Sequence, residues 1–417
     1  MTTAEESLAT GGMMAVRATT GTARRGPRLR PAAAFAGTAL AFVAVALAVG
    51  APSPLFVLYE QEWGFQPWLL TVAFAIYAVT LLITLLVAGS LSDHIGRRPV
   101  LIGALALQVV AMLVFLFAPD IGWIIGARSV QGVATGAAMS TFTAALVELA
   151  PERQKKLGAT IGSTAPVGGI AIGAFLTGLA VQFVPQPTTL VFVALAVLFA
   201  AGILVVVASP ETVERRPGAV RSLIPRLLIP REARGEFTGA IPLFLATWML
   251  AGLFIGLSPS ILHGVFHLDS GLLNGAIVAV PPAVGATAGL LLTRAPARRT
   301  VVWAMAAIVV GVVIAAVGMA AVALPLLFVG ATVAGGGFGA GFSAMLRMLA
   351  PLAPNDQRAE LFAAIFLVSY LAYGVPALVA GELIGWIGLL PTALGYSAAI
   401  AAAALVALVV QALRARR

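Results

Sequence analysis

One short stretch of the sequence carries residue types that do chemistry. In "GSLSDHIGRRPVLIG", residues 89–103, a carboxylate, a histidine and two arginines fall within six residues: Asp93, His94, Arg97 and Arg98. A carboxylate beside a histidine could serve acid–base catalysis, and paired arginines could bind phosphate groups. The choice depends on the elements that position this stretch, because the chain is only 10% charged and 60% hydrophobic.

The composition of the chain indicates a membrane protein. Its mean hydropathy is +1.03, whereas soluble domains are nearer half apolar and a quarter charged. The chain contains no cysteine, which excludes disulfides and thiolate metal ligands, and no metal site is expected. Residues 1–31 are predicted to form a disordered tail. A signal peptide is the alternative, but the apolar stretch from about residue 31 to 58 exceeds the roughly 7–15 residues of a signal core.

Apolar runs predict twelve transmembrane helices, because each crossing needs about 20 residues. Single spans are expected at 32–58, 68–90, 99–118, 121–147, 238–262 and 272–293. Three longer runs are each expected to fold back once: 157–208 at Pro185–Pro187, 300–349 near Pro325, and 361–413 between Gly385 and Pro391. Proline removes a backbone donor and disfavours helix at the preceding residue, so these are natural turns.

The basic side chains support twelve spans. If the helices alternate and both termini are cytoplasmic, every Lys and Arg except Arg128 falls in an inner loop or tail. This asymmetry is the positive-inside rule, and it predicts a multi-pass protein of the cell membrane. The net charge of +9 therefore reflects orientation and contact with anionic lipids, not nucleic-acid binding.

The spans divide into two similar halves. A charged linker, 209–236, separates six helices at 32–208 from six at 237–413, and a basic tail, 414–417, follows. Small residues recur at an offset of 203: Gly132, Gly136 and Ser140 correspond to Gly335, Gly339 and Ser343. We therefore predict an all-α membrane protein with two pseudo-symmetric six-helix bundles and a substrate path between them, as in rocker-type transporters.

The stretch at 89–103 resembles the signature of the loop between helices two and three in the major facilitator superfamily, G-x-L-[SA]-D-x-x-G-R-[RK]-x-x-L. The matching residues are Gly89, Leu91, Ser92, Asp93, Gly96, Arg97, Arg98 and Leu101. The resemblance covers about residues 32–413 and implies a secondary transporter. It also implies that the loop latches the cytoplasmic side in the outward-open state and releases it on inward opening. The alternative is that the two arginines only fix the topology.

Two further stretches resemble motifs of proton-linked exporters in this superfamily. "GARSVQGVATGAA", 126–138, matches the Arg-x-x-Gln-Gly motif through Arg128 and Gln131. "GSTAPVGGIAIGAF", 162–175, resembles the antiporter glycine–proline motif through Pro166, Gly168, Gly169 and Gly173, with Ala165 where that motif usually has glycine. These small residues would let helix five pack against the partner half. The resemblance implies exchange driven by the proton-motive force, without a cofactor.

Arg128 is expected about 10 Å deep in the membrane, where a charge normally faces a partner or a watery cavity. It could act with a carboxylate in proton coupling or bind an anionic substrate, or its side chain could extend to the outer headgroups. Glu382, in helix eleven, is the most membrane-embedded acid and the candidate proton carrier. Contact with the external headgroups is the alternative for Glu382.

The substrate cavity is expected to use polar and aromatic side chains of the spans. The candidates are Ser53, Tyr77, Ser163, Trp248, Asn274, Ser343, Tyr370 and Tyr373. Because no deep acidic pair is present, a neutral or weakly anionic amphiphile is favoured over a cation.

Transport by a monomer is the leading hypothesis, as a proton-coupled exporter whose partners are a small organic molecule, protons and membrane lipids. An importer or facilitator of a metabolite, with Arg128 binding an anion, is the alternative within transport. A polytopic membrane enzyme is the alternative outside it, and three scattered histidines argue against that class.

Overall fold

The computed structural model describes residues 29–66, 68–151, 155–225, 227–354 and 357–415, and within these ranges it contains helices and no strands. Twelve helical segments in these ranges are long and apolar enough to cross a membrane, which confirms the predicted class. Most of the predicted N-terminal tail, residues 1–28, lies outside the described ranges, as do residues 416–417.

The first six spans form one bundle. Its helices are α1 (Pro31–Gly50), α2 (Pro52–Trp63), α3 (Trp68–Ala88), the short α4 (Ser92–Ile95), α5 (Arg97–Leu116), α6 (Ile121–Leu149), α7 (Lys155–Phe183) and α8 (Pro187–Ala208). Residues 209–230 follow α8 and contain the short helix α9 (Ala219–Ser222). They are called the linker below, because residues 231–236 of the predicted linker form the start of α10.

The last six spans form the second bundle. Its helices are α10 (Arg231–Ala251), the π-helix η2 (Gly252–Leu257), α11 (Ser258–Gly264), α12 (Gly271–Leu291), the 3-10 turn η3 (Leu292–Arg294), α13 (Ala297–Ala320), α14 (Leu324–Leu349), the 3-10 turn η4 (Ala350–Leu352), α15 (Arg358–Ile387) and α16 (Leu389–Ala415).

The three predicted turns inside the long apolar runs are present. Pro187 begins α8 and Pro325 lies in the first turn of α14, where the missing proline N–H is not needed. Between α15 and α16 the chain turns at Gly388, whose φ of +88° favours glycine. Each predicted fold-back therefore has a local backbone cause.

Two spans are less regular than the sequence predicts. The first is divided at Ala51, just before Pro52, and the seventh contains the π-helical turn η2. π-Helical turns such as η2 are frequent at functional sites. The two irregular segments meet, because the Ser53 hydroxyl donates to the carbonyl of Ile255 across the bundles at 2.6 Å.

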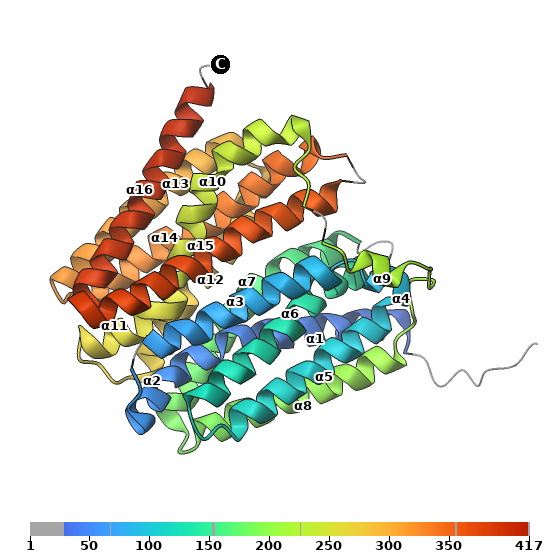
Figure 1. Cartoon of the computed structure of the whole chain (residues 1–417), viewed down its shortest axis with the longest axis horizontal. Helices are drawn as coiled ribbons and strands as arrows, with labels where there is room; N and C mark the ends of the chain where they lie inside the picture. Colours follow the sequence, from blue (N-terminus) through green and yellow to red (C-terminus); the bar gives the residue numbers. More distant parts are fainter. Residues whose placement is uncertain (1–28, 67, 152–154, 226, 355–356, 416–417) are drawn as a thin grey trace, which may run out of the picture.

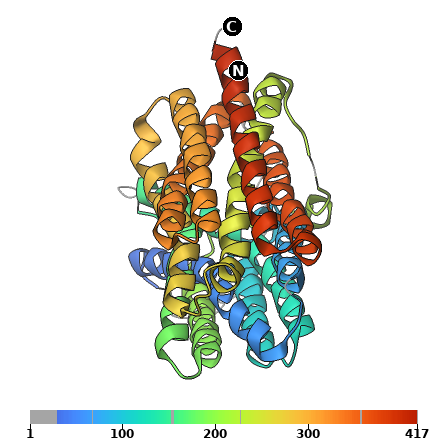
Figure 2. The same cartoon turned by 90° about the vertical axis from the view of Figure 1, so that its left-hand side faces the viewer.

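The two bundles pack through two helix pairs, α7 with α12 and α3 with α15 (Figures 1 and 2). In the first pair the backbones touch at Gly178, where an added Cβ would lie 2.6 Å from both the Gly271 carbonyl oxygen and the Gly275 Cα. In the second pair, Gly381 faces the side chain of Thr71. Glycine at these positions therefore permits close approach.

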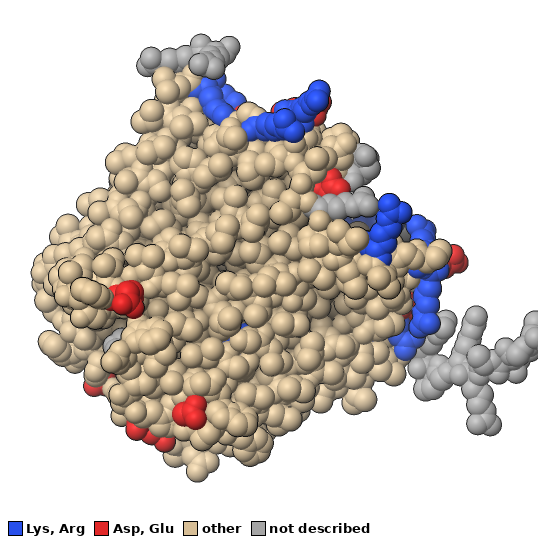
Figure 3. All heavy atoms as spheres, in the orientation of Figure 1, with Lys and Arg blue, Asp and Glu red and all other residues tan. Residues whose placement is uncertain are grey.

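The two ends of the molecule differ in charge (Figure 3). Lys and Arg side chains gather at one end, called the basic end, where α5, α7 and α10 begin and α16 finishes. The opposite end, called the acidic end, carries Glu60, Glu62, Asp120 and Asp269. The distribution matches the asymmetry of the predicted loops.

The bundles meet towards the acidic end. There Gln61 donates to Asp269 at 3.1 Å, and the Ser270 hydroxyl donates to Gln182 at 3.0 Å. The ribbons of α3 and α15 separate towards the basic end (Figure 1). The conformation is therefore one in which the bundles are closed at the acidic end.

Candidate functional site

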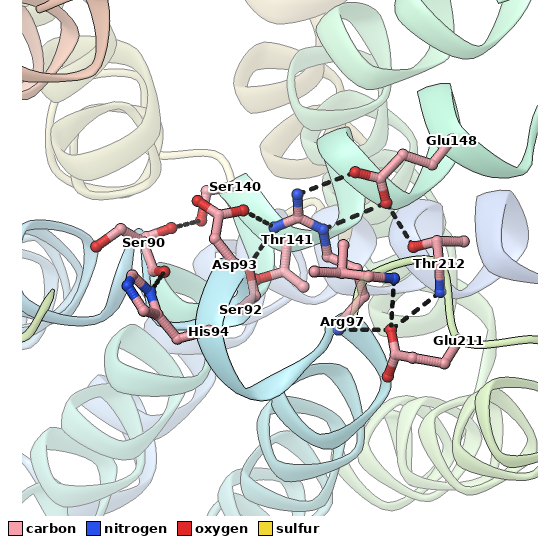
Figure 4. Close-up of polar contacts among 12 residues, drawn as sticks. Ser90, Ser92, Asp93, His94, Arg97, Ser140, Thr141, Glu148, Glu211 and Thr212 are labelled. Carbon is pink, nitrogen blue, oxygen red and sulfur yellow. Dashed lines mark hydrogen bonds and ion pairs between the residues drawn. The ribbon is translucent and has the colours of Figure 1, made fainter. Parts of the chain in front are cut away.

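Arg97, at the start of α5, is the centre of a charge network at the basic end (Figure 4). Its guanidinium lies 2.5 Å from the carboxylate of Asp93 and 3.0 Å from that of Glu148, at the end of α6. It also donates to the Ser92 hydroxyl at 2.6 Å. Because the Arg97 side chain is only 12% exposed, water screens these interactions less than it screens a surface ion pair.

Glu211, from the linker, caps the N-terminus of α5. Its two carboxylate oxygens accept the backbone N–H groups of Arg97 at 2.8 Å and Arg98 at 3.1 Å. Gly96, with φ +101°, permits this approach, since an added Cβ would lie 2.6 Å from Glu211 Oε2. Thr212 donates to Glu148 at 2.5 Å and joins the linker to the network.

The other arginine of the motif has a structural partner. Arg98 donates to the carbonyls of Val206, at 3.2 Å, and Val207, both at the end of α8. The Arg98 side chain is therefore held by helix carbonyls, because α8 ends beside the loop. Gly89 accepts from the Ser140 hydroxyl of α6 at 3.2 Å.

The linker is held to the same loop at two more points. The Arg216 N–H donates to the carbonyl of His94 at 2.9 Å, and the Ser90 hydroxyl donates to the carbonyl of Ser222 at 3.2 Å. Among the described residues, the contacts of this network join only the first bundle and the linker. A latch between the two bundles therefore stays a prediction for the outward-open conformation.

Arg128 is buried in α6, with 1% of its surface exposed. Its Nη1 donates to Gln131 Oε1 at 2.6 Å and its Nε to the Ala73 carbonyl at 3.4 Å. The guanidinium lies 4.1 Å from the ring centre of Tyr77 and 5.5 Å from that of Phe74. These contacts exclude the alternative in which the side chain extends to the headgroups. No described carboxylate forms an ion pair with it within 4.0 Å.

Gln131 fixes the arginine relative to two other helices. While its Oε1 accepts from Arg128, its Nε2 donates to the Ala48 carbonyl of α1 at 2.6 Å. Its own carbonyl accepts from Thr135, which in turn accepts from Gln108 of α5 at 3.0 Å. The Arg-x-x-Gln spacing therefore places both side chains on one face of α6, and Gln131 orients the charge.

The second bundle contains a cluster of five aromatic side chains, called the aromatic wall below. It consists of Trp248 on α10, Phe338 and Phe342 on α14, and Tyr370 and Tyr373 on α15. The Trp248 ring centre lies 4.9 Å from that of Tyr370 and 5.7 Å from that of Phe342. Offset and edge-on arrangements at such distances are favourable for aromatic rings.

Tyr373 connects the aromatic wall to the first bundle. Electrostatic interactions link it to both Arg128 and Tyr77, since α15 packs against α3. The structure thus brings together five residues that were predicted separately from the sequence and are called the central cluster below: Tyr77, Arg128, Trp248, Tyr370 and Tyr373. The pairing of helices supplies this proximity, and no local spacing could have shown it.

Other candidates lie apart from this cluster or have partners of their own. Ser163 is exposed and donates within α7, and Ser343 lies beside α12. Asn274 is 4% exposed, and its Oδ1 has no partner among the described residues. Glu382 is exposed and accepts from Trp386 of its own helix at 3.2 Å; its role as proton carrier stays a prediction.

The helix-five glycines pack inside the first bundle. Gly169 faces Ala46 and Gly173 faces Leu47, both on α1, while Gly168 has no neighbour within 4 Å. In this conformation Gly169 and Gly173 therefore contact α1, while alanines of the same stretch reach the second bundle. The Ala174 carbonyl oxygen lies 2.7 Å from a Cβ added at Gly275, and Ala171 belongs to the buried core of that bundle.

A sequence model described as the Major Facilitator Superfamily matches residues 38–313. None of the curated proteins compared with the chain matches it. Solved structures are similar over most of the chain.

Three such structures illustrate the similarity, which at this identity concerns the fold alone. A peptide transporter of the POT family, solved with alafosfalin, has 15% identity and a TM-score of 0.71 over 92% of this chain and 94% of its own. The nucleoside transporter NupG has 12% identity and a TM-score of 0.68 over 91% of this chain and 99% of its own. The human organic anion transporter MFSD10 has 17% identity and a TM-score of 0.63 over 90% of this chain and 98% of its own.

Proposed function

Because the chain belongs to the Major Facilitator Superfamily, we propose that it is a secondary transporter that exports a small organic molecule in exchange for protons. It works by alternating access and is not an enzyme. The observation that carries this proposal is the position of Arg128: a buried charge of the first bundle that interacts electrostatically with Tyr373 of the second. A charge at such an interface normally marks a transport path.

The packing of the bundles supports alternating access. Glycine contacts and hydrogen bonds close the acidic end, while α3 and α15 diverge towards the basic end (Figure 1). Rocking of one bundle against the other about the central cluster would exchange the closed and open ends. The central cluster then faces each side in turn.

The charge asymmetry supports an orientation. With the basic end on the cytoplasmic side of the cell membrane, both termini are cytoplasmic and the arginines contact anionic lipids. In this orientation the end at which the bundles are closed faces the outside of the cell.

A second candidate, an importer or facilitator of an anionic metabolite, is favoured by one observation. Arg128 has no carboxylate partner among the described residues, so its charge is available to a substrate anion. Both candidates share the site and the conformational cycle. They differ in direction and in the role of the proton.

A ligand screen followed by flux measurements tests the proposed function. Compounds that raise the thermal unfolding temperature of the purified protein are supplied to liposomes containing it, under an imposed pH gradient. We expect accumulation of a bound compound against its own gradient, and loss of accumulation when an ionophore dissipates the pH gradient. Lipophilic drugs as hits favour export and metabolites favour import. If the compound equilibrates across the liposome membrane whether or not a pH gradient is present, the protein is a facilitator. If no bound compound crosses the membrane, transport is refuted.

Asp93→Asn is expected to change the balance between the two conformations. The substitution removes the charge 2.5 Å from Arg97 while preserving size, and the resemblance assigns that charge to the latch. We expect the population closed at the basic end to fall. The chain has no cysteine, so spin labels at Leu157→Cys and Leu291→Cys, both exposed, report the distance there.

Glu214→Gln provides the matched control for Asp93→Asn, because Glu214 is an exposed linker carboxylate. The Glu214→Gln protein should give the same spin-label distances as the unsubstituted protein. If the Asp93→Asn protein also gives those distances, Asp93 is not part of the latch.

A further inference from the structure

The central cluster contains hydrogen-bond donors that the protein leaves unused. The guanidinium of Arg128 has five N–H groups, and none of the described residues accepts from its Nη2. The indole N–H of Trp248, across the interface, is buried and also lacks an acceptor in the described structure. A buried donor without an acceptor is costly, so the indole N–H calls for a ligand that supplies an acceptor, and Nη2 of Arg128 is a second donor open to the same ligand.

The charge of Arg128 is likewise unbalanced inside the protein. Tyr77 and Phe74 place ring faces against the guanidinium, but neutral rings attract a cation without cancelling its charge. No carboxylate of the described chain pairs with it. A ligand that completes the site therefore carries negative charge, and an ammonium group would meet repulsion there.

The aromatic wall selects the rest of the ligand. Trp248 and Tyr370 stand 4.9 Å apart at an interplanar angle of 53°, and Tyr373 lies edge-on to Trp248. Such an array offers ring faces and edges to a flat group, which packs against them more favourably than a saturated group of equal size.

From these observations we propose that Arg128 of the first bundle and Trp248 of the second, which are linked through Tyr373, together bind a planar aromatic organic anion. Its acid group accepts from the guanidinium of the first bundle, and its ring lies against the aromatic wall of the second. The ligand thus bridges the two bundles, which ties its binding to their relative position. This inference rests on the proposed transport function, of which it names the substrate class.

Four probes of matched shape test the proposal. These are 2-naphthoate (anionic, aromatic), 2-naphthamide (neutral), 2-naphthamidine (cationic) and decalin-2-carboxylate (anionic, saturated), titrated calorimetrically into the purified full chain. We expect 2-naphthoate to bind about 10- to 100-fold more tightly than the amide, because a charged acceptor strengthens the hydrogen bond. The amidine should bind most weakly, and the saturated acid several-fold more weakly than 2-naphthoate. Equal affinities for the naphthoate and the amide, or no naphthoate binding, would overturn the proposal.

Variants separate the two parts of the site. Arg128→Gln should remove the preference for the anion over the amide, and Trp248→Leu should remove the preference for the aromatic over the saturated acid. Arg221→Gln, at an exposed linker arginine, should change neither. If Arg128→Gln does not fold, Arg128→Lys keeps the charge but loses the planar fork, and it should retain a reduced anion preference.

Flux distinguishes failure of this inference from failure of the proposed function. In liposomes containing the protein, exchange of 2-naphthamide or 2-naphthamidine without exchange of 2-naphthoate would refute the substrate class and leave transport intact. Binding of 2-naphthoate that depends on Arg128, without exchange of any probe, would support the site and refute transport of its ligand.

Discussion

Arg128→Ala is expected to abolish coupled flux of the compound selected by the ligand screen. The substitution removes the buried guanidinium and leaves Gln131 Oε1 without its donor. Hydrogen bonds of charged groups contribute about 1.5–3 kcal/mol each, so loss of two corresponds to a fall in flux of about 100-fold or more. The measurement is accumulation in liposomes under a pH gradient, with the amount of folded protein matched.

Ser129→Ala is the control for Arg128→Ala. The neighbouring Ser129 hydroxyl donates only to the Ile125 carbonyl of its own helix, at 2.9 Å, so flux should stay within about twofold. Normal flux in Arg128→Ala would remove this residue from the mechanism.

Gly178→Val is expected to block transport by preventing closure of the acidic end. Even a Cβ at this position would lie 2.6 Å from the backbone of α12 at Gly271 and Gly275, and backbone cannot move aside as a flexible side chain can. The bundles must separate there, which costs the packing between α7 and α12. We expect flux to fall about 5- to 150-fold, which corresponds to the 1–3 kcal/mol of an overpacked contact.

Distances across the acidic end give the direct readout for Gly178→Val. Spin labels at Trp68→Cys and Ile387→Cys, on α3 and α15, should move apart in this variant. Gly103→Val is the matched control, because no atom lies within 4 Å of a Cβ at Gly103. A Gly178→Val protein with unchanged distances and flux would show that this contact does not close the end.

Much of the fold could be predicted because membranes impose simple rules on sequence. Span length, proline positions and arginine placement together give twelve helices and the turns near Pro325 and Gly388. The division of the first span at Ala51 and the π-turn in the seventh could not, because apolar composition is unchanged by a local shift in backbone hydrogen bonding. Only the division of the first span had a signal in the sequence, Pro52, because proline removes a backbone donor.

The site was predicted in its parts but not in its assembly. Asp93 and Arg97 are neighbours in sequence and form the ion pair that such spacing allows. Glu211 was not foreseen as their partner, because it lies 114 residues from Arg97 and long-range pairing leaves no periodic signal. Tyr373 likewise reaches Arg128 only because α15 packs on α3. Conversely, Glu382 lies inside a long apolar run of the sequence, yet its side chain is exposed in the fold.

The attachment of the linker to the first bundle gives the molecule a tether of fixed length. Ser222 is held to Ser90 of the first bundle, and Ile229 packs against the core of the second, so the two attachments are seven residues apart in the chain. Seven extended residues reach no further than about 25 Å. While both attachments hold, this length limits the separation of the bundles at the basic end, and with it the size of a molecule that can enter there.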